Sequence, residues 1–215
     1  MKKTQLFLAF IAAGALMTSC AGETAHEGEE TTTETSEEVA VSSDGEWVID
    51  TEKSTITWEG GTAGKQVYAH TGTLKIKEGK ITSADNMVTG GLIIVDMSSI
   101  NPTDENYSEE HPASDLVGHL SSPDFFDVAN NPTATFAIKE AHGNDIHGTM
   151  TIRGTSNEEH IQFDMINFTP EGEMTGEGMM EFNRQNYGVA WKHYLKDVIL
   201  ADGIQLRFNI VAKKA

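Results

Sequence analysis

The stretch that decides the fold is Ile-His-Gly-Thr-Met-Thr-Ile-Arg, residues 146–153. Every second residue from Ile146 to Ile152 is apolar or glycine, and the residues between them are polar or charged. In a β-strand such residues lie on opposite faces, so one face would be buried and the other solvated. This alternation is typical of antiparallel sheets. The stretch therefore predicts an antiparallel strand whose apolar face lies on a core.

The same period of two recurs along the chain from residue 47 onward. Turn signals rich in glycine, asparagine and proline separate the segments. Residues 92–95 are apolar at every position, which predicts a strand covered on both faces. About eight to ten strands of this kind indicate a β-sandwich or a closed barrel, and periodicity leaves the two open. The alternating apolar positions include Ile56 and Trp58, Leu74 and Ile76, Phe136 and Ile138, Ile161, Phe163 and Met165, and Ile204 to Ile210.

Residues 104–127 interrupt the β pattern. The spacing of Leu116 and Leu120 predicts one short helix that starts near Pro112, and a second turn starts at Pro123. A long insertion in an all-β chain is often a lid or a binding loop. We therefore expect this segment to border a functional site.

The N-terminus has the pattern of a secretory signal. Lys2 and Lys3 precede an apolar run, residues 6–16, that is too short to span a bilayer as a helix. The order Leu-Met-Thr-Ser-Cys at residues 16–20 resembles a bacterial lipobox, cleaved before the cysteine. We expect a signal peptide over residues 1–19 and lipidation of Cys20, the single cysteine of the chain. The alternative is an ordinary secretory signal followed by an incidental cysteine.

An acidic tether follows the cysteine. Residues 21–46 hold nine acidic residues, no lysine or arginine and no aromatic residue. Such a segment buries too little apolar surface to fold, and its like charges keep it extended. The expected organisation is a signal peptide over 1–19, a lipidated cysteine with a disordered tether over 20–46, and a folded domain over 47–215.

Charge and motifs exclude several classes of function. The formal net charge of −18 opposes binding to nucleic acid, and it opposes docking of a basic patch on anionic lipid. Residues 60–65 resemble a phosphate loop but lack its first glycine and its final serine or threonine. The chain has neither a nucleophile elbow nor closely spaced pairs of histidines. We therefore expect no catalytic residue, no metal site and no required cofactor.

Several segments together resemble the YceI-like, polyisoprenoid-binding family. The resemblance implies an all-β, antiparallel, lipocalin-like barrel of about eight strands with a short helical insertion near residues 104–127. It also implies a cavity that holds an isoprenoid lipid, a polyprenyl chain or a quinone, for transport, storage or sensing. The segments that carry it are WVID at 47–50, DMSSI at 96–100, DLVGHL at 115–120, PDFFDV at 123–128, HGTMTIRG at 147–154 and NRQNYGV at 183–189.

An isoprenoid chain requires an apolar tunnel, because water solvates it poorly. Aromatic and aliphatic residues on the inward faces are candidates to line it, although alternation marks burial and plain core packing is the commoner explanation for any one of them. Arg184 could meet a pyrophosphate head group, or could pair with a carboxylate such as Asp127 or Asp115. His119 is expected to form a structural hydrogen bond beside Asp115. The candidate ligand-binding residues are Trp58, Phe125, Phe126, Phe136, Phe163, Phe182, Arg184, Tyr187 and Trp191.

The sequence thus predicts a membrane-tethered lipid-binding barrel without catalytic activity. One alternative is a structural or protein-interaction barrel with a filled interior. A second is an enzyme acting on a lipid or quinone head group, with Arg184, His119 and Asp115 at the cavity mouth. Ala21 after the cysteine is not the aspartate that retains lipoproteins at the inner membrane. The expected location is therefore the outer membrane, on its periplasmic or surface side, and a homodimer remains open.

Overall fold

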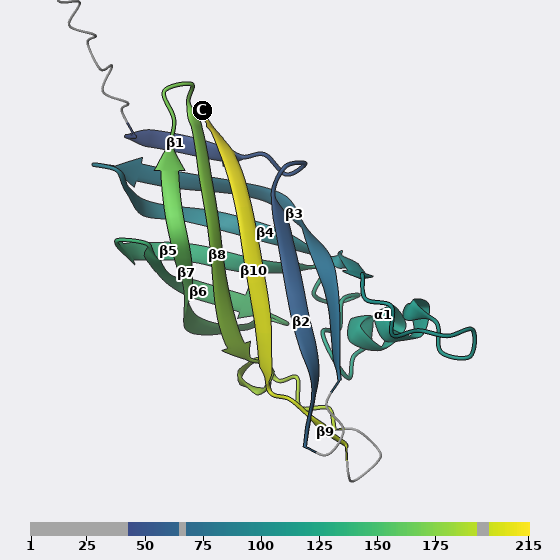
Figure 1. Cartoon of the computed structure of the whole chain (residues 1–215). Coiled ribbons are helices and arrows are strands. Elements are labelled where there is room, and N and C mark those ends of the chain that lie inside the picture. Colours follow the sequence, from purple (N-terminus) through teal and green to yellow (C-terminus); the bar gives the residue numbers. More distant parts are fainter. Residues whose placement is uncertain (1–42, 65–67, 193–197) are drawn as a thin grey trace, which may run out of the picture. The chain divides into compact units, whose positions relative to one another are not determined.

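The computed structural model describes residues 43–64, 68–192 and 198–215 (Figure 1). The predicted signal peptide, Cys20 and residues 21–42 of the tether lie outside the described residues. The predicted boundary at residue 47 is too late, because Ser43 is buried and Gly45 and Glu46 lie in a strand. Among the described residues, no helix has the length and apolar character needed to cross a bilayer.

Eight antiparallel strands close into a barrel. Neighbours along the chain pair in sequence, and β10 pairs with both β8 and β2, which closes the sheet. Trp58 is opposite Leu206 at this closure. The barrel fold and the strand number are therefore confirmed, and the alternative of a sandwich is wrong. The barrel strands are β2 (Thr55–Gly64), β3 (Ala69–Ala84), β4 (Met87–Pro102), β5 (Thr133–His142), β6 (Asp145–Ile152), β7 (Thr155–Phe168), β8 (Glu173–Asn183) and β10 (Gly203–Lys214).

Two short strands and one helix complete the fold. β1 (Gly45–Ile49) pairs with β10 and β3, and β9 (Val198–Leu200) pairs with β2 at the opposite end (Figure 1). The helix α1 (Ala113–Ser121) lies in the connection between β4 and β5 and begins directly after Pro112, as the sequence predicts. A 3-10 turn, η1 (Arg184–Tyr187), follows β8.

The end of the barrel nearest β1 is filled with side chains. Trp47 is fully buried, donates its indole N–H to Ser83 Oγ at 2.6 Å, and packs against Phe168 with ring centroids 5.2 Å apart. Ile146, Ile161 and other aliphatic residues pack around a void of only about 30 Å³. This end of the barrel is therefore a conventional core.

Two predicted faces differ from the observed ones. A bulge between Phe163 and Met165 adds one residue to β7, which reverses the alternation. Met165 consequently points outward and is 58% exposed, whereas the sequence pattern places it inside. The run at 92–95 is not covered on both faces either, because Leu92 is exposed on the outer face of β4.

Candidate functional site

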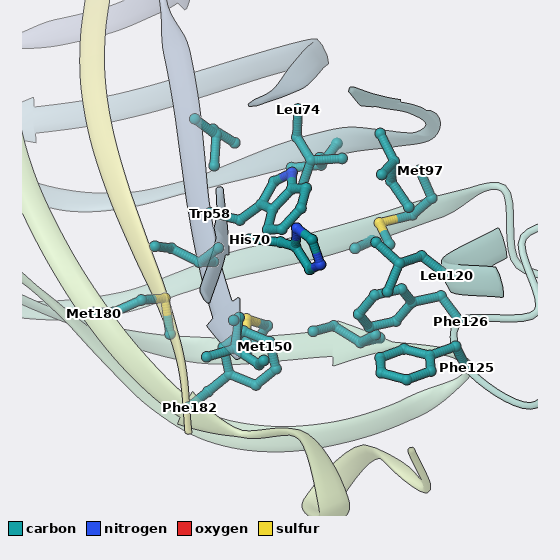
Figure 2. Close-up of a pocket in the computed structure, with 18 of the residues that line it drawn as sticks. Trp58, His70, Leu74, Met97, Leu120, Phe125, Phe126, Met150, Met180 and Phe182 are labelled. Atoms are coloured by element: carbon teal, nitrogen blue, oxygen red, sulfur yellow. The ribbon is translucent and has the colours of Figure 1, made fainter. Parts of the chain in front are cut away.

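The other half of the barrel encloses an apolar cavity of about 350 Å³. Volumes of this size are typical of small-molecule sites in proteins. Figure 2 shows side chains from several strands and from the segment around α1 pointing into a shared space. The wall is almost wholly aliphatic, aromatic and thioether. It includes Ile56, Leu74, Ile93, Met97, Ile100, Leu116, Leu120, Ala134, Met150, Met180, Ile204 and Phe208.

Six of the predicted ligand-binding residues line this cavity. They come from separate parts of the chain: β2, the loop after α1, β5, the end of β8 and the segment after η1. Adjacent Phe125 and Phe126 both contribute, with ring centroids 5.3 Å apart in an edge-to-face arrangement. The six are Trp58, Phe125, Phe126, Phe136, Phe182 and Trp191.

Phe163 and Tyr187 do not line the cavity. Phe163 lies in the packed half, beside the small void, where it covers the backbone of Gly176 and Gly178. Tyr187 is buried edge-on against Phe182 and donates its hydroxyl to Glu159 at 2.8 Å. Both residues are inward or buried, as their patterns suggest, but they support the wall and do not form it.

Arg184 is a buried structural cation, not a head-group ligand. It is 2% exposed and donates to the carbonyl oxygens of Val189 at 2.5 Å, Ala201 at 3.0 Å and Trp191 at 3.2 Å. Its ion pair is with Asp202, at 2.8 Å, instead of Asp127 or Asp115. Burial lowers the pKa of the Arg184 guanidinium, and Asp202 opposes that shift. These bonds hold the segment that carries Trp191 against the barrel.

Two nitrogens of the cavity wall lack partners. Trp58 Nε1 and His119 Nε2 are buried and make no hydrogen bond with the described residues. His119 packs edge-on against Trp191, with ring centroids 4.5 Å apart, and against Phe125. Burial lowers the pKa of the His119 imidazole, although Asp124 opposes the shift, so the ring is neutral near pH 7. The structural hydrogen bond expected for His119 is not made at Nε2, and Asp115, one turn earlier in α1, is exposed.

The lining residues that sequence reasoning missed include His70, at the rim. His70 Nδ1 lies 3.2 Å from Asp104 Oδ1 and 3.1 Å from the Tyr107 hydroxyl, which donates to Asp104 Oδ2 at 2.8 Å. Burial tends to raise the pKa of Asp104. Hydrogen bonds from Tyr107, two backbone N–H groups and His70 outweigh it and lower the pKa to about 2. Only proximity in the fold reveals this network, because β3 and the loop after β4 supply its members.

We expect Asp104→Asn to cost about 2 kcal/mol of unfolding free energy near pH 7. The Asp104 side chain is 11% exposed, so solvent screens it little. Its pKa in the folded state is below the ordinary 3.8, so the carboxylate stabilises the fold above pH 4. That contribution is lost as the pH falls toward 2. Urea unfolding between pH 7 and pH 3 should show wild type and variant converging, and parallel curves would contradict the assignment.

Curated relatives match part of the chain. A UPF0312 protein of Staphylococcus epidermidis is 30% identical over 107 residues, which cover 46% of this chain and 61% of the relative. A UPF0312 protein of Staphylococcus aureus is 29% identical over 100 residues, covering 44% and 58%. The chain thus spans less than two thirds of the length of these relatives.

Two solved structures share the fold. BcnA of Burkholderia cenocepacia superposes with a TM-score of 0.61 at 19% identity, over 77% of this chain and 99% of that one. A polyisoprenoid binding domain from Saccharophagus degradans, implicated in plant cell wall breakdown, gives 0.51 at 10% identity, over 79% and 98%. The barrel is therefore a known fold.

The family comparison covers the whole barrel. The model of the YceI-like domain matches residues 47–212, from Trp47 in β1 to Ala212 in β10. This range contains the cavity wall, the rim network and α1. The chain therefore belongs to the YceI-like domain family.

Proposed function

We propose that the barrel binds an isoprenoid or similar long apolar lipid in its cavity, without catalysing a reaction. The observation that carries the proposal is the apolar cavity of about 350 Å³, walled by aromatic and methionine side chains. Such a wall gains free energy by covering hydrocarbon, and methionines adapt to an irregular chain. The solved Saccharophagus degradans domain, of the same fold, is a polyisoprenoid binding domain.

The two unpartnered nitrogens favour a lipid that carries an oxygen, such as a quinone, over a pure hydrocarbon. A buried N–H without an acceptor costs about 1–3 kcal/mol, which a ligand oxygen would recover. Trp58 Nε1 is a donor only, and neutral His119 can donate or accept at Nε2.

The enzyme alternative needs Arg184, His119 and Asp115 together at the cavity mouth. Of these three residues only His119 lines the cavity, so the geometry favours binding over catalysis.

A structural barrel would be expected to fill its interior, as the half around Trp47 does. The described residues instead leave the second half open beneath α1 and the loop that follows it. Phe125, Phe126, Leu116 and Leu120 from this insertion form one side of the cavity. Because insertions of this kind can act as lids, we assign residues 104–127 the role of covering the bound lipid.

Filling the cavity should abolish lipid binding. Ala134 lies on β5, is 9% exposed and faces the cavity, so Ala134→Phe would place a ring in the ligand space. We expect native mass spectrometry to detect a copurified lipid on the wild-type full-length chain and none on the variant. Added ubiquinone should quench the fluorescence of Trp58 and Trp191 only in the wild type.

The matched control is Ala137→Phe, on the outward face of the same strand, which should retain the lipid. Circular dichroism checks that all three proteins fold. The proposal would be overturned if the purified wild-type chain carries no lipid and if neither ubiquinone nor polyprenol quenches its tryptophan fluorescence. Equal binding by wild type and Ala134→Phe would show that the ligand lies elsewhere.

Tethering is a further part of the proposal. We propose that Cys20 carries the lipid anchor, that residues 21–42 form the spacer, and that the barrel stands at the outer membrane. The lipobox-like order of residues 16–20 supports this arrangement. Mass spectrometry of the mature N-terminal peptide tests it, and an unmodified Cys20 would refute it.

A further inference from the structure

A cluster of metal-ligating side chains lies on the outer face of the barrel, across β6 and β7. His147 and His160 are directly opposite each other in the strand register. Asp145 precedes His147 by two residues, so both side chains emerge on the same face. The three side chains lie on the outer face, and the inward neighbour Ile146 belongs to the packed half of the barrel.

The three side chains already converge. Asp145 Oδ2 lies 3.0 Å from His147 Nε2, and Asp145 Oδ1 lies 2.7 Å from His160 Nδ1. The two imidazoles stack with centroids 5.3 Å apart and planes inclined by 25°. One ligand atom from each residue lies within 4.8 Å of the others. Tetrahedral Zn²⁺ with bonds of about 2.0–2.1 Å places its ligand atoms roughly 3.3 Å apart, so small side-chain rotations suffice.

A bulge in β5 brings two more ligand-type residues to the same face. The register of β5 against β6 shifts by one residue between Ile138 and Glu140. The residue that packs on the core is therefore Ile138 before the bulge and Ala141 after it. Glu140 is therefore opposite His147, and His142 is opposite Asp145. The His142 ring lies 5.2 Å from the His147 ring. His142 is thus a neighbour of the cluster, although its ligand atoms are not among the three that converge.

The charge of the cluster suits a cation. Asp145 supplies a carboxylate whose two oxygens point at the two imidazoles. One oxygen and two imidazole nitrogens form a donor set that suits a divalent transition-metal ion. The net charge of −18 also draws cations to the protein.

We propose that Asp145, His147 and His160 bind a divalent transition-metal ion, with Zn²⁺ as the probe of choice. The donor set of two imidazoles and one carboxylate is common for zinc and leaves one position for His142 or water. The sequence gives no sign of this site, because His147 and His160 are distant along the chain and only the strand register brings them together.

Isothermal titration of the full-length chain, purified without a polyhistidine tag and stripped with chelator, tests the proposal. We expect one Zn²⁺ per chain at this site. We expect the double variant His147→Asn, His160→Asn to lower the affinity at least about tenfold, and Asp145→Asn to weaken it less. Co²⁺ should give a visible spectrum in the wild type that the double variant loses. These side chains are partly exposed on the outer face, so the fold should persist, as circular dichroism would verify.

Two matched controls separate this site from other histidines. His26 belongs to the acidic tether and His111 precedes α1. The variants His26→Gln and His111→Gln should both leave the titration unchanged. The proposal is overturned if the wild type gives no saturable Zn²⁺ binding. It is also overturned if the double variant binds as tightly as the wild type, or if His26→Gln alone removes the binding. Each result is independent of whether the cavity holds a lipid.

Discussion

Arg184→Met should lower the unfolding free energy by about 3 kcal/mol, the largest stability loss among the substitutions considered. Removing one partner of a buried, hydrogen-bonded charge pair typically costs about 3–5 kcal/mol. Asp202 is 43% exposed, so water can solvate its carboxylate after the substitution. The greater part of the loss comes from the carbonyls of Val189, Trp191 and Ala201, which would lose their donors. A loss of this size lowers the melting temperature by roughly 6–12 °C.

Asp202→Asn is the matched control for this prediction. If the guanidinium acts mainly through its hydrogen bonds to the backbone, the control should cost clearly less than Arg184→Met, because all three backbone acceptors keep their donors and an asparagine oxygen can still accept from Arg184. The loss of unfolding free energy in Arg184→Lys should lie between those of Arg184→Met and Asp202→Asn. An ammonium keeps the charge, but it cannot reach all four acceptors from one position. Thermal and urea unfolding of the three variants distinguish these cases. An Arg184→Met protein as stable as the wild type would disprove the structural role.

The sequence predicts the inward faces well wherever the strand is regular. The alternation from Ile146 to Ile152 is reproduced in the structure, because a pleated strand leaves no other arrangement. The pattern fails where a bulge adds a residue, as between Phe163 and Met165. Such a shift depends on the partner strand, and the local sequence carries no signal for it. The closure of β2 on β10 is likewise a long-range pairing that periodicity cannot reveal.

The same limit applies to the cavity. Phe163 and Phe182 both alternate with polar residues, yet Phe163 belongs to the packed half and Phe182 to the cavity wall. What separates them is their height along the barrel axis, which follows from strand register. The environment of Arg184 also depends on residues distant in the sequence, because its four acceptors lie 5 to 18 residues farther along the chain. Its environment could not be assigned before those segments were placed.

Gly72→Ala should weaken both stability and lipid binding, because the Trp58 indole fills the space that a side chain at residue 72 would need. Gly72 on β3 is directly opposite Trp58 on β2. A Cβ atom at residue 72 would lie 2.6 Å from Cε2 of Trp58 and closer still to the carbonyl oxygen of Asn101. The contact with the carbonyl forces β3 and β4 apart locally, and the contact with Trp58 also pushes the indole toward the cavity. Overpacking of this kind costs about 1–3 kcal/mol.

The displaced indole would also occupy ligand space, so we expect the affinity for ubiquinone to fall by about tenfold, measured by tryptophan quenching. Gly118→Ala is the matched control. Gly118 is an exposed residue of α1, and a Cβ atom there would meet nothing within 4 Å. Alanine in place of glycine within a helix should raise stability by about 0.5–1 kcal/mol and leave binding unchanged. Equal unfolding midpoints for Gly72→Ala and wild type would show that the Trp58 ring is not confined. A loss of stability without a loss of affinity would place the lipid away from Trp58.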